Sequence, residues 1–138
     1  MQRERIEGIS IRSEEDVVGI PGISEQQLAL FLIRERPHLE VAYEKVIFEY
    51  VKDDGRLIGT TPDFRITNTR TGQVVYLEIT TASLNGKDPK ERQKTVMKSH
   101  PGVRYTVLYR ENLRLIQEKH QDYRFFNGKK MREEEIII

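Results

Sequence analysis

The sequence has 138 residues and a net charge of +1, and 37% of its residues are hydrophobic and 33% charged, which fits one domain and is too apolar for a disordered chain. It contains no cysteine, which excludes disulfides, thiolate-bound zinc and a thiol nucleophile and agrees with a reducing cytoplasm. No apolar run approaches the roughly 20 residues that span a bilayer, and the first ten residues resemble no secretory signal, so we expect a cytoplasmic protein without membrane association.

The first predicted helix covers residues 24–36, after an opening segment, residues 1–23, that indicates at most short strands. Ser24 and Gln27 have the spacing of a capping box, in which each side chain satisfies a backbone N–H at the start of a helix. Pro37 cannot continue the helix and ends it.

Three strand-like segments follow and are separated by two turns. They cover residues 46–52, 56–68 and 73–81, and the last of them is the richest in β-branched and aromatic residues. Turn sequences at 53–56 and 70–72 join them, and both contain glycine. The pattern predicts a meander of three antiparallel strands.

The second half of the chain predicts a crossover connection. A helix is expected over residues 88–100, with an N-terminal Asp-Pro, and a fourth strand over 103–109. A strand, a helix and a strand in this order favour pairing of the fourth strand parallel to the third. A last helix is expected over 111–120, and the tail, residues 124–138, has no predicted role. We therefore predict one α/β domain with a mixed four-stranded sheet flanked by helices.

Two acids lie on neighbouring predicted strands. Asp63 is near the start of one strand and Glu78 near the end of the next, so a tight turn between the strands brings them opposite each other. Adjacent carboxylates repel and raise each other's pKa, and a divalent cation such as Mg²⁺ resolves this conflict. The alternative is one buried acid, protonated or hydrogen-bonded, beside an exposed one.

The motif TPDF at residues 61–64, a turn, and YLEIT at residues 76–80 together resemble the signature of the PD-(D/E)XK, or restriction-endonuclease-like, nucleases. The family core is a helix, a three-stranded meander, a helix and a further strand, which matches the predicted order over about residues 24–110. The resemblance implies one nuclease-like domain over residues 1–138 that hydrolyses DNA phosphodiester bonds with Mg²⁺ or Mn²⁺.

The resemblance also implies roles for individual residues. Asp63 and Glu78 match the two metal-binding acids of the family, and the backbone carbonyl of Ile79 matches a third oxygen ligand. Glu25 matches an additional acid on the first helix, and Glu44 is a rival for that role. On the sequence alone, the favourable position of an acid at a helix N-terminus is a sufficient explanation for Glu25 and the preferred one.

Thr80 departs from the family pattern, which has a lysine here to stabilise transition-state charge. Gln93 and Lys94 lie on the following helix, where some members of the family carry an active-site glutamine or a relocated lysine. Lys94 could supply the missing charge, with Lys87 and Lys98 as alternatives; otherwise metal ions suffice, or the site is inactive.

Basic residues are concentrated in the second half of the sequence. Residues 1–60 contain 8 Lys and Arg against 12 Asp and Glu, whereas residues 61–138 contain 15 against 10. We expect the residues that contact the DNA backbone to be Arg65, Arg70, Lys87, Lys90, Arg92 and Lys98.

A homodimer or a larger nuclease assembly would cut both strands. The alternatives are a catalytically inactive nuclease-fold module that binds nucleic acid or a protein partner, and an interaction domain without any nucleic-acid role.

Overall fold

The computed structural model describes residues 3–5, 8–44, 46–81, 84 and 87–125. The strands are β1 (Arg3–Arg5), β2 (Ile9–Ile11), β3 (Leu39–Tyr43), β4 (Val46–Val51), β5 (Leu57–Thr60), β6 (Phe64–Asn68), β7 (Val74–Ile79) and β8 (Tyr105–Leu108). The helices are α1 (Glu14–Val17), α2 (Ile23–Glu35), α3 (Lys87–Ser99) and α4 (Arg110–Lys119). The predicted mixture of helices and strands is therefore confirmed; of the tail at 124–138, only the first two residues are described.

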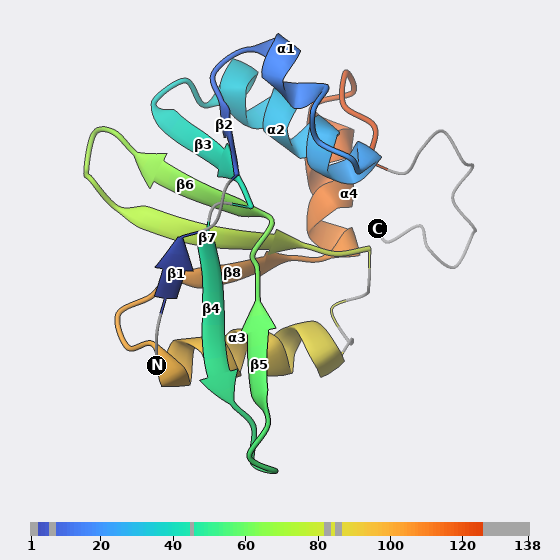
Figure 1. The fold of residues 1–138 in the computed structure, drawn as a ribbon. Helices are drawn as coiled ribbons and strands as arrows, with labels where there is room; N and C mark the ends of the chain where they lie inside the picture. The colour runs from blue at the N-terminus through green and yellow to red at the C-terminus, as the bar shows by residue number, and fades with distance from the viewer. Residues whose placement is uncertain (1–2, 6–7, 45, 82–83, 85–86, 126–138) are drawn as a thin grey trace.

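The strands form two sheets, which corrects the predicted single meander. One sheet has five strands in the order β2-β3-β6-β7-β8, and the other has three in the order β1-β4-β5. The predicted β6–β7 antiparallel pair and β7–β8 parallel pair are both present. However, the β4–β5 hairpin leaves the main sheet, and β3, a strand that we did not predict, pairs with β6 in its place. In Figure 1 the hairpin runs crosswise to β7.

The physical reason for the split is the break between β5 and β6. Pro62 lies in this break and cannot donate a backbone hydrogen bond, so a single strand across residues 56–68 is not continued. The short turn before β5 is as predicted, with Gly55 at φ 88°. The chain therefore makes one hairpin, changes direction at Pro62 and enters the second sheet.

Each face of the five-stranded sheet packs against different elements. One core lies between the sheet and helices α2 and α4 and is mainly aliphatic, and it includes Phe64 and Leu77. The other core lies towards β4 and α3 and is rich in tyrosine. It contains Val46, Phe48, Tyr50, Tyr76, Val96, Tyr105, Val107 and Tyr109. Alternation along β7 sends successive side chains into the two cores.

The start of α2 differs from the prediction. The helix is capped by Gly22, and Ser24 lies inside it, so the capping box at Ser24 and Gln27 is wrong. The Ser24 hydroxyl instead donates to the carbonyl of Phe125 at 2.8 Å, and the Gln27 amide oxygen accepts from the Arg124 N–H. The predicted cap residues thus attach the end of the described chain to the first long helix. None of the helices in the described ranges has the length and apolar character needed to cross a membrane.

Candidate functional site

Asp63 and Glu78 occupy opposing positions on β6 and β7. The register pairs Phe64 with Leu77, so one step further along the ladder Asp63 faces Glu78, in agreement with the predicted register. Asp63 directly precedes β6, and its Oδ2 accepts a hydrogen bond from the Ile79 N–H at 2.7 Å. The carboxylate of Asp63 is therefore fixed to the end of the neighbouring strand. It was the carbonyl of Ile79 that the resemblance implied as a ligand; the observed contact uses its N–H.

The environment of Asp63 favours its protonated form. Burial raises the pKa of Asp63 to about 7, against the lowering effect of the Ile79 N–H, and the nearby carboxylates of Glu25, Glu78 and Glu44 raise it further. Desolvation and the nearby negative charges both disfavour the ionised form of Asp63. Both acids that the sequence left as rivals, Glu25 and Glu44, thus act on Asp63.

Glu25 and Glu44 reach this region from different elements. Glu25 lies in the first turn of α2 and is half-buried, and its carboxylate folds back so closely over the N-cap that any side chain at Gly22 would collide with it. Glu44 directly follows β3, and its N–H donates to the Asp63 carbonyl at 2.9 Å. Its φ of 48° lies in the left-handed region, which costs free energy in a residue with a side chain.

Glu78 is buried and is held by two donors. Arg92 of α3 forms a two-pronged ion pair with it, through Nε to Oε1 at 2.8 Å and through Nη2 to Oε2. The Tyr105 hydroxyl donates to Oε1 at 2.6 Å. The hydrogen bonds with Glu78 raise the pKa of Arg92, and burial together with Glu78 raises the pKa of Tyr105. Both oxygens of Glu78 are thus already bound.

Tyr109 is a second aromatic residue near Glu78. It lies two residues beyond Val107, the parallel partner of Glu78, and therefore on the same face of the sheet. Its side chain is buried in the tyrosine-rich core, and its hydroxyl has no hydrogen-bond partner among the described residues. Burial, and then the charge of Glu78, raises the pKa of Tyr109. A buried hydroxyl without a partner is uncommon in folded proteins.

The remaining residues predicted to be catalytic are Thr80, Gln93 and Lys94. Thr80 directly follows β7 and is half-buried, and its N–H donates to the Leu108 carbonyl at 2.9 Å. The Gln93 amide donates to the Tyr105 carbonyl at 2.8 Å, which anchors α3 to β8. Lys94 is exposed on α3. The structure thus brings Arg92, rather than Lys94, into contact with Glu78.

Of the residues on α3 that were expected to contact DNA, Arg92 is instead bound to Glu78. Lys90 and Lys98 are exposed, and the side chain of Lys87 lies outside the described residues. A pocket of about 700 Å³ between α3 and the β4–β5 turn includes four acids, Asp53, Asp54, Asp88 and Glu91. Arg70 is exposed at the β6–β7 turn, and Arg65 is half-buried in the middle of β6.

Sequence reasoning missed the tyrosines of the site. Tyr43, at the end of β3, has its pKa raised by burial and then by Glu44, Glu25 and Asp63, which places its hydroxyl in the same acidic region. The signal for Tyr105 and Tyr109 was present in the alternation of the segment 103–109, which puts both on one face. Arg92 was expected to contact DNA and instead binds Glu78; the signal for this inward direction was its spacing of four residues from Val96, a buried residue of α3.

Comparisons with protein-family models, with curated proteins and with solved structures found no match for this chain.

Proposed function

We propose that the protein is a metal-dependent nuclease that hydrolyses phosphodiester bonds of DNA at Asp63 and Glu78. The observation that carries the proposal is the pair of opposed acids with contrasting surroundings. The pKa of Asp63 is raised to about 7, whereas Glu78 is bound by Arg92 and Tyr105. Strongly perturbed carboxyl groups next to a fixed cation are typical of catalytic sites.

The donor atoms of the site are compatible with Mg²⁺ or Mn²⁺, which prefer oxygen ligands. Asp63 and Glu78 would hold the ion, with the Ile79 carbonyl as a third oxygen. No cluster of three or more His, Asp or Glu residues arranged to hold a metal occurs within the described part of the chain, and a cation would compete with Arg92 for Glu78. When bound, such an ion supplies positive charge to the phosphate and acidifies water.

The residues themselves support metal binding and charge stabilisation. The raised pKa of Asp63 belongs to the site without a cation, and a bound cation would lower it and keep the carboxylate ionised as a ligand. Arg92, already next to Glu78, can stabilise the charge that develops on a phosphate. In the family that the sequence resembles, a lysine at the position of Thr80 would stabilise this charge. Glu25 and Glu44 increase the proton affinity of Asp63.

A second candidate is a catalytically inactive module of the same fold. The specific observation in its favour is the saturation of Glu78, since Arg92 and Tyr105 occupy both of its oxygens and neutralise it. Thr80 in place of a lysine agrees with this reading. Such a module would bind nucleic acid or a protein partner without cleaving it.

The deciding experiment is a cleavage screen of plasmid, single-stranded and branched DNA in Mg²⁺ and in Mn²⁺. We expect the wild-type protein to cleave at least one substrate, and Asp63→Ala and Glu78→Ala to lose about 100-fold or more of the rate. Glu118→Ala removes an exposed acid on α4 and serves as the matched control. Cleavage by Asp63→Ala at the wild-type rate would refute the proposal. DNA binding without cleavage, and without heat of Mn²⁺ binding in calorimetry, would favour the inactive module.

A further inference from the structure

Two hollows lie side by side along the five-stranded sheet, one over β2, β3 and the end of α2 and the other over β7 and the loop before β8. One, of about 540 Å³, includes Arg12 and Ala42, and the other, of about 470 Å³, includes Arg104; both are lined by Arg65 and Thr67. Because they share two lining residues of β6, the hollows adjoin each other. We call the two together the arginine groove, defined by Arg12, Ala42, Arg65, Thr67 and Arg104.

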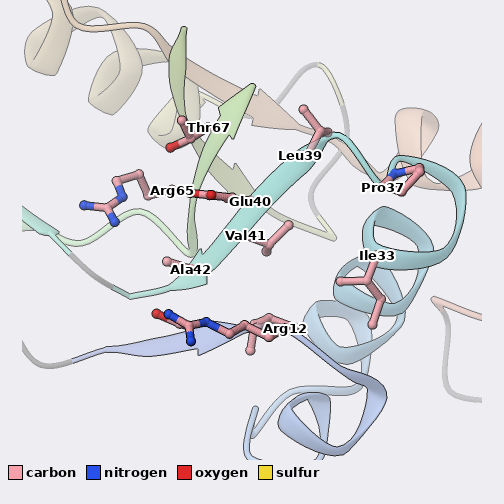
Figure 2. Close-up of a pocket in the computed structure, with 11 residues that line it drawn as sticks. Arg12, Ile33, Pro37, Leu39, Glu40, Val41, Ala42, Arg65 and Thr67 are labelled. Carbon is pink, nitrogen blue, oxygen red and sulfur yellow. The ribbon is translucent and has the colours of Figure 1, made fainter. Parts of the chain in front are cut away.

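The strand register explains the shape of the groove. Ser10 pairs with Ala42, Ala42 with Arg65, and Arg65 with Tyr76, so these four residues lie in one row across the sheet and on one face. The centre of the row is the small side chain of Ala42, which leaves space between longer neighbours. In Figure 2 the guanidinium groups of Arg65 and Arg12 extend in the same direction, with Ala42 between them in the view.

The charge of the groove is predominantly positive. Arg12 and Arg65 form no ion pair with any acid in the described ranges, and Arg104 makes only a long contact, 3.5 Å, with the amide oxygen of Gln73. Glu40 is the single acid among the lining residues. Guanidinium groups with free N–H donors match the geometry of phosphate oxygens.

The groove adjoins the acids of the proposed active site. Asp63 and Arg65 are two residues apart, so they lie on the same side of the chain and about 7 Å from each other along it. A strand of nucleic acid with one phosphate at Asp63 would therefore place a neighbouring phosphate near Arg65. Each hollow has the volume of a small-ligand pocket, a size suited to the backbone of one strand.

We propose that the arginine groove binds the phosphate backbone of an unpaired nucleic-acid strand and directs that strand towards Asp63. The inference rests on the proposed function, because it names the part of the substrate that this site holds. Contacts from arginine to phosphate fix the position of the strand without reading its sequence. The groove thus specifies a single-stranded segment, either free or at the junction of a branched substrate.

The test measures binding separately from cleavage. A fluorescein-labelled 15-nucleotide oligothymidine is titrated in EDTA, at several KCl concentrations, and its anisotropy is recorded. The double variant Arg12→Gln/Arg65→Gln is compared with Lys52→Gln/Lys119→Gln, which makes the same change in net charge at exposed positions outside the groove. We expect the groove variant to bind about tenfold more weakly or worse. The slope of log affinity against log salt should fall by about 1.4.

Several outcomes separate the two proposals. Equal binding by the groove variant and wild type, or no binding by wild type, would overturn the groove. A wild-type protein that binds the oligonucleotide through the two arginines but cleaves no DNA in Mg²⁺ or Mn²⁺ would overturn the nuclease and leave the groove supported. If the groove variant loses thermal stability relative to wild type, Thr67→Glu provides the second test, because it introduces a negative charge at a position shared by both hollows. Undiminished binding by Thr67→Glu would contradict the groove.

Discussion

Asp63 and Glu78 face each other across the β6–β7 ladder, but their surroundings are opposite. Glu78 lies in the tyrosine-rich core, where an arginine and a hydroxyl bind both of its oxygens. Asp63 is held by one backbone N–H and is surrounded by further acids, which together with burial raise its pKa to about 7. The comparison shows that identical charge types on adjacent strands acquire different protonation behaviour from the elements packed around them.

Removing the cation from Glu78 should have the largest effect on stability. Arg92→Ala leaves a buried carboxylate with Tyr105 as its remaining donor, and we expect a loss of about 2–3 kcal/mol in the free energy of unfolding. Urea denaturation measures this quantity. Lys94→Ala, which truncates the exposed neighbouring residue, should change it by less than about 0.5 kcal/mol. In the double variant Arg92→Ala/Glu78→Gln much of the loss should be recovered. An unchanged free energy of unfolding in Arg92→Ala would show that the ion pair does not stabilise the fold.

Removing the charge at Asp63 should raise the free energy of unfolding instead of lowering it. The pKa of Asp63 in the folded protein, about 7, lies above the value of about 3.9 for an unfolded chain, so between these values the folded state binds the additional proton. The free energy of unfolding therefore falls as pH rises through this window. Asp63→Asn removes the penalty and should stabilise the protein by about 2 kcal/mol at pH 8, and by less than half as much at pH 5. A pH-independent effect, or a loss of stability at pH 8, would contradict the assignment.

The smallest effects should distinguish the two tyrosines beside Glu78. Tyr105→Phe removes a hydrogen bond to a charged group and should cost about 1.5 kcal/mol or more. Tyr109→Phe removes a hydroxyl that has no partner among the described residues, so its stability should remain within about 0.5 kcal/mol of wild type or increase. Thermal melting of both variants, side by side, makes this comparison. Equal losses in the two variants would place Tyr109 in a contact similar to that of Tyr105.

Much of the local structure follows from the sequence alone. The long helix before Pro37, the strands at 46–51 and 74–79, the turn at Gly55 and the parallel return of β8 were predictable from periodicity, turn residues and the crossover pattern. Periodicity also placed Asp63 opposite Glu78, because a short turn between paired strands fixes their register.

Tertiary packing decided the remaining features. β3 is only five residues long and has no clear alternation, so its place beside β6, and the departure of the β4–β5 hairpin into another sheet, depend on contacts far apart in sequence. The same is true of Ser24, which bonds to the carbonyl of Phe125 instead of capping its own helix. Local propensity cannot anticipate a partner that is supplied by a distant segment.

The sequence determined the positions of Asp63 and Glu78, and the tertiary structure determined their protonation and charge pairing. Position follows from the two-residue period of strands, which is a local property of the backbone. Protonation and charge pairing depend on burial and on Arg92, Glu25 and Glu44, which reach the acids from a helix, another helix and a loop. Electrostatic interactions act through space, and only the folded chain brings those groups within range.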